Sequence, residues 1–224
     1  MIGTIIYEGP SMLDGKPIVA IATNNSTNRK TGNMVQVWIL RRNIDPVQAV
    51  KTGGDRSICG SCYHRGTADR PRTCYVNIGQ APLSVWRAYR AGSYARGKLE
   101  VSGRAVRLGA YGDPVAVPWH AYEGLHLATR WTGYTHQWRE LIARPFRNVL
   151  MASCDSAADM AEAAADGWRA FRVTSLDEAP PEDAILCPSE RGTQCADCGL
   201  CAGLQHAQAP HIYIPAHGTA KRFV

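Results

Sequence analysis

The sequence predicts an α/β fold in which a parallel sheet is open or curved into a partial, degenerate βα barrel. Three observations favour it. From residue 104 onward, runs of β-branched and aromatic residues alternate with short helical patterns. Three further strand-like runs fill residues 1–42 and predict a β-rich N-terminal segment. Seven of the eight cysteines fall within residues 59–74 and 187–201, which predicts cysteine-rich metal-binding loops.

The chain has 224 residues, enough to bury a substantial core without disulfide staples. We therefore expect one domain over residues 1–224. Its expected parts are a β-rich segment (1–42), a first cysteine group (43–80), βα units (81–186), a second cysteine group (187–205), and a final strand and tail (206–224).

The opening residues show no cationic stretch followed by an apolar run, and no segment approaches the roughly 18 apolar residues of a membrane span. We therefore expect a cytoplasmic protein with no membrane partner. In the cytosol thiols stay reduced, so clustered cysteines indicate a metal site more often than disulfides. The net charge of +6 and the pI near 9.0 suit contact with DNA or RNA, although many proteins without such a partner share them.

The first 42 residues predict three strands, IIYE, PIVAIATN and MVQVWILR, separated by Gly- and Asn-rich turns. Residues 24–33 (NNSTNRKTGN) predict an exposed loop between the second and third strands. Its two cations, Arg29 and Lys30, could touch a ligand, although a solvated loop explains them as well.

The first cysteine group follows a short helical turn, NIDPVQAVK. Cys59 and Cys62 form a Cys-x2-Cys pair, and Cys74 opens an expected strand, CYVNIG. Three thiolates could hold an iron–sulfur cluster with one open coordination position, or close a zinc site with His64 or another residue. Neighbouring arginines favour ionised thiols; they are Arg56, Arg65, Arg70 and Arg72.

Residues 81–98 predict a helix with Val85, Trp86 and Tyr89 on one side and arginines on the other. Basic residues interleaved with aromatic ones are one signature of nucleic-acid binding, and a solvated helix face explains them equally well. DNA or RNA therefore remains a possible partner of this Arg-rich surface.

From residue 104, strands and helices alternate in short units. The expected strands are RAVRLGAYGDP, TRWTGYTHQ, NVLMASCDS, WRAFRVTS, AILCP and HIYIPAHG. The expected helices are HAYEGLHLA, QWRELIAR and SAADMAEAAADG, the last with Ser156 as N-cap. Repeated units of this kind predict a parallel sheet.

The second cysteine group combines Cys187-Pro with Cys195-x2-Cys198-x2-Cys201. This spacing is similar to the ligand set of iron–sulfur ferredoxins, with the Cys-Pro placed before the triplet. Four thiolates also suit a closed structural zinc site. The remaining alternative is four unliganded or disulfide-paired cysteines.

Candidate catalytic residues come from the ends of the expected strands, because ligands gather at the carboxyl edge of parallel sheets. Asp113, His136 and Asp155 are the candidates for substrate binding and acid–base chemistry. Asp155 could instead begin a helix, and His136 could be an ordinary hydrogen-bonded histidine. Cys154 is a buried thiol or a fourth ligand for the first group. The same reasoning brings Tyr134, Ser175, Cys187 and His217 to this edge, so we expect a metal site built into it.

The order SICGSCY, VRLGAYGDP, a late Cys-Pro and CADCGLC resembles an uncharacterised family of cysteine-rich phage and prophage proteins. That family is similar in turn to phage proteins of radical-SAM type. The resemblance covers roughly residues 50–205 and implies a degenerate βα barrel of TIM-barrel-like kind with a bound iron–sulfur cluster. Its cysteine positions are matched by Cys59, Cys62, Cys187, Cys195, Cys198 and Cys201. Radical-SAM enzymes bind their cluster through Cys-x3-Cys-x2-Cys; position 55 is Asp here, which argues against S-adenosylmethionine as a ligand.

These features predict an iron–sulfur protein, with one or two 4Fe-4S clusters, that serves as a phage accessory enzyme on nucleic acid or a nucleotide-derived substrate. One alternative is a non-catalytic, zinc-stabilised nucleic-acid-binding module. Another is an electron-transfer or redox-sensing protein. The cysteines predict either two separate sites or one shared site, and the oligomeric state stays open.

Overall fold

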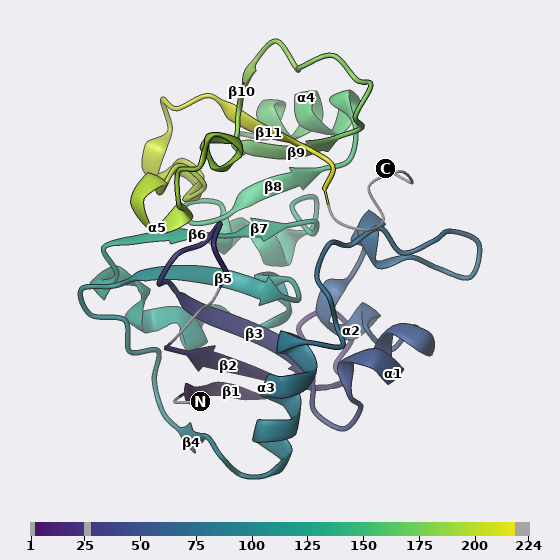
Figure 1. Cartoon of the computed structure of the whole chain (residues 1–224), viewed down its shortest axis with the longest axis vertical. Coiled ribbons are helices and arrows are strands. Elements are labelled where there is room, and N and C mark those ends of the chain that lie inside the picture. Colours follow the sequence, from purple (N-terminus) through teal and green to yellow (C-terminus); the bar gives the residue numbers. More distant parts are fainter. Residues whose placement is uncertain (1–2, 25–27, 218–224) are drawn as a thin grey trace.

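The computed structural model describes residues 3–24 and 28–217. Its strands form two sheets, with the orders β4-β1-β2-β3-β5-β6 and β10-β11-β9-β8-β7 (Figure 1). The strands are β1 (Gly3–Pro10), β2 (Pro17–Thr23), β3 (Val35–Arg41), β4 (Ala95–Arg96), β5 (Ala105–Tyr111), β6 (Arg130–Thr132), β7 (Tyr134–Thr135), β8 (Met151–Cys154), β9 (Ala170–Thr174), β10 (Ala184–Leu186) and β11 (His211–Pro215).

The N-terminal segment forms the three strands that its sequence predicts. β1 pairs antiparallel with β2, and β2 pairs antiparallel with β3. β2 lies inside the sheet, and its residues after Pro17 are all buried, because apolar side chains cover both of its faces. Residues 28–33 lie in the loop before β3, while residues 25–27 of the predicted loop lie outside the described residues.

Most of the remaining strand pairs are parallel, which confirms the expected α/β fold, and β1 also pairs in parallel with the short β4. β3, β5 and β6 are parallel in the first sheet, and all five strands of the second sheet are parallel. β6 and β7 are separated by Gly133 alone, so one stretch of chain serves as the edge of both sheets. The larger hydrophobic cluster takes residues from both sheets, among them Ile21 and Leu108 of the first and Ala152 of the second.

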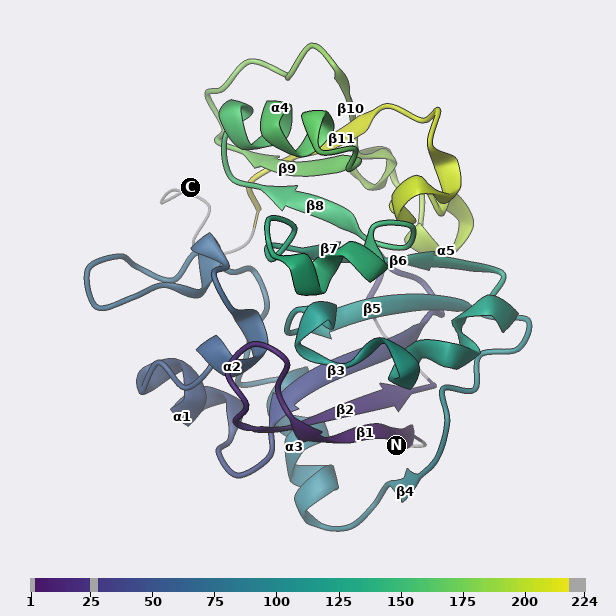
Figure 2. The ribbon, with the colours of Figure 1, turned by 180° about the vertical axis from the view of Figure 1, so that it is seen from behind.

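The α-helices are α1 (Pro46–Lys51), α2 (Arg56–Cys59), α3 (Ala81–Arg90), α4 (Ala157–Ala165) and α5 (Cys195–Cys198). Figure 2 shows α4 and short helical turns on the near side of the sheets. α4 begins as predicted, with the Ser156 side chain accepting a hydrogen bond from the Asp159 amide. None of the described helices combines the length and apolar character that crossing a membrane requires.

Three expected elements differ from the prediction. Residues 119–127 and 141–146 are 3-10 helices instead of α-helices, and Pro145 inside the second cannot donate a backbone hydrogen bond. Residues 74–79 form no strand, so the strand predicted to begin at Cys74 is wrong. The Arg72 guanidinium binds the Cys74 and Val76 carbonyls at 2.9 Å each, which occupies groups that a neighbouring strand would use.

Gly112 ends β5 in a conformation that only glycine adopts without strain. Its φ is +83°, and an added Cβ would lie 2.9 Å from the Ile39 carbonyl oxygen. We predict that Gly112→Ala lowers the free energy of unfolding by about 2–4 kcal/mol, the sum of a left-handed backbone and a backbone clash.

Gly103→Ala is the matched control for that change. Gly103 has a φ of +70°, but a Cβ there would meet no atom within 4 Å. It should cost only the conformational part, about 1–2 kcal/mol. Urea unfolding of both variants measures the difference, and equal losses would contradict the proposed clash with β3.

Candidate metal centre and cavity

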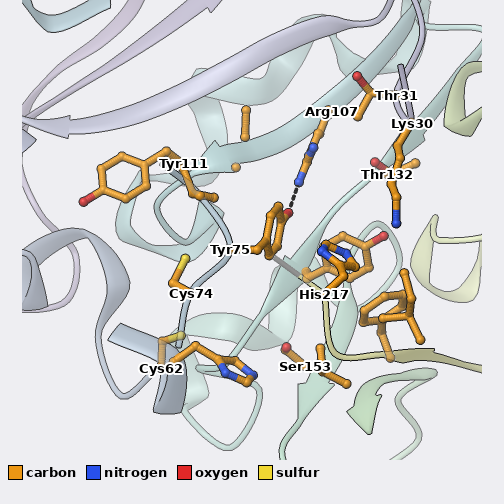
Figure 3. A pocket seen from close by; sticks show the side chains of 18 of the residues that line it. Lys30, Thr31, Cys62, Cys74, Tyr75, Arg107, Tyr111, Thr132, Ser153 and His217 are labelled. Carbon is orange, nitrogen blue, oxygen red and sulfur yellow. Dashed lines mark hydrogen bonds between the residues drawn. The ribbon is translucent and has the colours of Figure 1, made fainter. Parts of the chain in front are cut away.

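A cavity of about 230 Å³ lies against the two sheets and is lined by side chains from β5, β7, β8, β9 and β11. Both cysteine groups reach it. Figure 3 shows Cys62 and Cys74 at one side of the cavity and Lys30 at the other, with Arg107 and Tyr75 between them. The volume is below the roughly 300–1,000 Å³ typical of pockets for drug-sized ligands, so it suits a smaller molecule.

The first cysteine group lies where the strands β5 and β7 end. Cys59 is the last residue of α2, Cys62 follows a tight turn, and Cys74 returns from the next loop. The amides of Thr73 and Cys74 both donate to the His64 carbonyl, at 3.1 and 2.9 Å, which fixes the returning loop beside Cys62. The structure therefore brings together the three cysteines that the sequence singles out here.

Burial dominates the chemistry of these thiols. It raises the pKa of Cys59 well above its usual value, and the neighbouring Cys62 raises it further. Burial also raises the pKa of Cys74, although the Arg72 guanidinium opposes this. Without a ligand the buried thiols keep their protons, so any metal bound here must displace them.

His64, His136 and Asp155 meet beside these thiols. Oδ1 of Asp155 lies 3.3 Å from Nε2 of each imidazole, and the three ligand atoms all lie within 4.8 Å of one another. Nδ1 of His64 is held by the Thr73 hydroxyl at 2.8 Å, which leaves Nε2 pointing towards Asp155. That buried Nε2 makes no hydrogen bond of acceptable geometry within the described part of the chain.

His64, His136 and Asp155, called the triad below, interact electrostatically with the first cysteine group. Although burial of its ring opposes protonation, Cys62 and Asp155 raise the pKa of His136 well above its usual value. Burial works against the charge of Asp155 too, but the hydrogen bond from His136 and the nearby imidazole of His64 outweigh it and lower its pKa. Ser156 caps α4, and Asp155 directly precedes it, so Asp155 lies at the helix start while its carboxylate faces the two imidazoles.

Asp113 positions this centre. Its Oδ2 accepts hydrogen bonds from the Thr135 hydroxyl, the His136 amide and Nε2 of Gln137, at 2.9–3.2 Å, and its Oδ1 accepts from the Val115 amide at 3.0 Å. Burial raises the pKa of Asp113, and these donors oppose that rise. With four donors on one carboxylate, Asp113 is suited to hold His136 in place more than to transfer protons.

The second cysteine group lies at the opposite, amino-terminal edge of the strands. The Cys195 amide donates to the Lys30 carbonyl just before β3, at 2.8 Å, and the Cys201 carbonyl accepts from Gly133 at 3.2 Å. Arg169, at the start of β9, binds the Leu200 carbonyl at 2.7 Å. The expectation that this site shares the edge that carries Asp113 and Asp155 is therefore wrong for the Cys195–Cys198 helix and Cys201.

Cys187 and Cys195 face the cavity, whereas Cys201 is buried behind Tyr134. Burial raises the pKa of Cys201 to about 12, although the Tyr134 hydroxyl opposes this by hydrogen bonding to the sulfur. Burial raises the pKa of Cys195 too, and Arg107 opposes it. All eight cysteines are free thiols, and neither group brings three sulfurs within 4.8 Å of one another.

Comparisons with protein-family models, curated proteins and solved structures find no match to this chain. The chemistry of the site must therefore be inferred from its own geometry.

Other predicted residues divide between cavity and core. Tyr134 and His217 line the cavity. Cys154 is buried, donates to the Ala152 carbonyl, and does not line the cavity, which agrees with a buried thiol. Sequence reasoning missed Arg107 and Tyr75. A local signal for Arg107 does exist. It is the one charged residue of the apolar run AVRLGAY, and a strand this apolar is expected to be buried together with its arginine.

The role of Asp113 can be tested by Asp113→Asn. If the asparagine oxygen accepts from the three donors near Oδ2, its NH2 group takes the place of Oδ1 and faces the Val115 N–H. Two donors then face each other, and the Val115 N–H loses its acceptor. We predict a loss of about 1–3 kcal/mol in the free energy of unfolding, the cost of a buried donor left without an acceptor.

Asp45→Asn is the control, because Asp45 accepts from the Val47 and Gln48 amides at the start of α1 and asparagine caps helices equally well. That change should cost a few tenths of a kcal/mol at most. Denaturant unfolding of both variants decides the matter, and similar losses would show that the Asp113 network is dispensable.

Proposed function

We propose that this protein is an iron–sulfur enzyme that acts on a small molecule bound in the cavity. The observation that carries the proposal is the convergence of Cys59, Cys62 and Cys74 on the cavity beside His136 and Asp155, at the carboxyl ends of parallel strands. Three thiolates bind three irons of a 4Fe-4S cluster and leave the fourth free for a substrate.

The loop geometry supports Cys74 as the third ligand. Asp55, which stands where radical-SAM proteins have their first cysteine, is 2% exposed and forms an ion pair with Arg65 at 2.6 Å. It does not line the cavity, whereas Cys74 lines it together with Cys59 and Cys62. A ligand set completed by Cys74 is consistent with the radical-SAM-like resemblance and differs from that family in the order of its ligands.

The arrangement of the strands adds to this reading. The cysteine-bearing loop follows β3, which is parallel to β5, and β6–β7, β8, β9 and β11 continue the parallel order across both sheets. We infer that the two sheets act together as a partial βα barrel whose inner side is the cavity. Active sites of such folds lie at the carboxyl ends of the strands, where this centre lies.

The spacing of the sulfurs favours a cluster over a single zinc ion. Sulfurs of a tetrahedral zinc site, with Zn–S bonds of about 2.3 Å, lie about 3.8 Å apart. Neither cysteine group brings three sulfurs within 4.8 Å of one another. A cluster holds its thiolates on separate metal atoms and so suits wider spacing. The group of Cys187, Cys195, Cys198 and Cys201 supplies four thiolates for a second, fully ligated cluster.

A cluster at the first group would supply one-electron or Lewis-acid chemistry at its open iron. The protein's own groups then have defined tasks. Asp155 holds the imidazole of His136 at 3.3 Å, and Asp113 fixes the His136 backbone, so a proton on this imidazole faces the cavity in a fixed direction. The apolar cavity wall excludes water from the reacting atoms.

Metal and sulfide analysis of single Cys→Ser variants, purified without oxygen, tests the proposal. Wild-type protein should be brown, with iron and acid-labile sulfide in near-equal amounts. Cys62→Ser should lose one complement and Cys198→Ser the other, because the two groups lie at opposite edges of the strands. Cys154→Ser, which alters the buried thiol away from the cavity, should keep both.

Other outcomes identify the alternatives. Zinc without sulfide, together with salt-dependent DNA binding, would replace the enzyme by a zinc-stabilised nucleic-acid-binding module. Two clusters that are reduced reversibly, with no substrate bound in the cavity, would indicate an electron-transfer or redox-sensing protein. Loss of all iron from either Cys62→Ser or Cys198→Ser would indicate one shared site.

A second candidate is a mononuclear metal enzyme built on His64, His136 and Asp155. Two ligand atoms about 2.0–2.1 Å from a tetrahedral metal lie about 3.4 Å apart, close to the 3.3 Å measured from Asp155 to both imidazoles. Two histidines and one carboxylate with an open position are typical of catalytic zinc and non-haem iron sites. The unsatisfied Nε2 of His64 favours this candidate.

Cobalt binding separates the two candidates. In protein carrying Cys59→Ser, Cys62→Ser and Cys74→Ser, a triad site should still bind one Co²⁺ with visible d–d bands and no sulfur charge-transfer band. Adding His64→Ala should abolish those bands, whereas His120→Ala, which changes an exposed histidine, should not. Complete loss of Co²⁺ binding in the triple serine variant would rule out the triad as an independent site.

A further inference from the structure

Arg107 is a buried cation in the wall of the cavity that has no anionic partner among the described residues. Its exposed fraction is 9%, and its one hydrogen bond there runs from Nη2 to the hydroxyl of Tyr75 (Figure 3). No described carboxylate forms an ion pair with it, although ten such contacts occur elsewhere in this part of the chain.

Each of the other buried arginines has a backbone carbonyl or a carboxylate as a partner, although Nε of Arg172 has no partner within the described residues. Arg41 binds the carbonyls of Pro17 and Gly54 and the Ser57 hydroxyl. Arg169 binds four backbone carbonyls, and Arg172 pairs with Glu178. Arg107 thus departs from the pattern of its own fold, and its free donors line a cavity instead of protein backbone.

Removing a guanidinium from water is strongly unfavourable unless hydrogen bonds and an opposite charge replace the lost solvation. Within the described part of the chain, the neighbouring groups supply no negative charge to Arg107. Lys30, which also lines the cavity, is itself a cation, and the carboxylate nearest to it, Glu190, is already paired with it at 2.7 Å. His217 packs against Tyr75 with ring centroids 5.0 Å apart, and burial lowers its pKa, with Lys30 adding to the effect. An anion entering the cavity would relieve this imbalance.

We propose that Arg107 and the Tyr75 hydroxyl bind the oxyanion head of a small substrate, a carboxylate or a phosphate monoester, whose flat apolar body lies in the rest of the cavity. A guanidinium fork matches both heads by paired hydrogen bonds. The body would lie against Tyr134 and Phe171, whose rings pack at a tilt of 48° with centroids 4.4 Å apart, and against Val173 and Ile214. This proposal adds the substrate class to the proposed function. It rests on that function in one respect, because both take the cavity as the substrate site.

Cys195 is the competing partner for Arg107, because the two interact electrostatically across the cavity. If the second cysteine group carried a cluster, its negative charge would attract the same guanidinium. The two roles differ in what they predict. An anion-binding arginine governs ligand affinity, whereas a cluster-stabilising arginine governs the iron content and spectrum of the second group.

The test uses the full-length protein as purified, with its metal content measured in the same sample. Benzoate and phenyl phosphate serve as probes, and benzamide is the neutral probe of the same shape. Calorimetric titration and thermal unfolding are measured for wild type, Arg107→Gln, Tyr75→Phe and Arg87→Gln, the last a matched charge change on the exposed side of α3. We expect saturable binding of at least one acid and none of benzamide, and the tighter acid identifies the head group.

Arg107→Gln should weaken acid binding at least about tenfold, Tyr75→Phe by several fold, and Arg87→Gln not at all. Without ligand, Arg107→Gln should unfold at the wild-type temperature or above it, because it removes an uncompensated buried charge. That result is the opposite of what a structural arginine predicts.

Three results would overturn the inference: no binding of either acid to wild type, equal binding to Arg107→Gln, or a changed iron content in Arg107→Gln with acid binding intact. Acid binding that depends on Arg107 in protein containing only zinc, or no metal, would uphold the anion site. The same result would contradict the iron–sulfur proposal. The anion-site proposal and the iron–sulfur proposal can therefore fail separately.

Discussion

The passage of the chain through Gly133 is the constraint on which the arrangement of this protein depends. On one side of it β6 pairs with β5, and on the other β7 pairs with β8. Its carbonyl accepts from Met151 at 2.9 Å, and its amide donates to Cys201 at 3.2 Å. A Cβ there would lie 2.4 Å from Leu150 Cδ2 and 3.0 Å from Leu108 Cβ, so a larger residue would require these side chains to shift. Two sheets, one core and the second cysteine loop therefore meet at one closely packed point.

Asp113 has a similar role at the other edge. Its amide donates to the Ile58 carbonyl at 2.6 Å, one residue before Cys59, while its carboxylate fixes the backbone of His136. The first cysteine loop and the histidine of the triad are thus placed by the same residue. Hydrogen bonds within the protein fix the relative positions of these groups. If the groups bind a metal as proposed, ligands organised in this way lose less conformational entropy on binding.

Much of this fold can be predicted from the sequence, because its signals are local. Runs such as VQVWILR and NVLMASCDS form strands, and Ser156 begins α4 through its own side chain. Asp113, His136 and Asp155 come together because the ends of parallel strands share an edge. The features that sequence reasoning does not predict depend on contacts between distant parts of the chain. The strand expected at Cys74 is prevented by Arg72, and the edge reached by Cys195 and Cys201 depends on how a long loop returns. The unpaired state of Arg107 depends on which residues of other strands face it, which no local pattern contains.

The positions of Arg107 and the first cysteine group constrain how a substrate lies in the cavity. Arg107 is near the start of β5, and Tyr111 at its end adjoins the cysteines and the triad. β5 bulges between these two residues, which lie opposite Gln36 and Trp38, so they are separated along the sheet by about two strand residues, roughly 7 Å. On the proposals above, an oxyanion held at Arg107 places the opposite end of the molecule near His136 and Cys62. The charged head would then provide binding energy at a distance from the reacting atoms. Binding energy from a remote group of this kind can hold a substrate in a reactive orientation without stabilising its unreacted bonds.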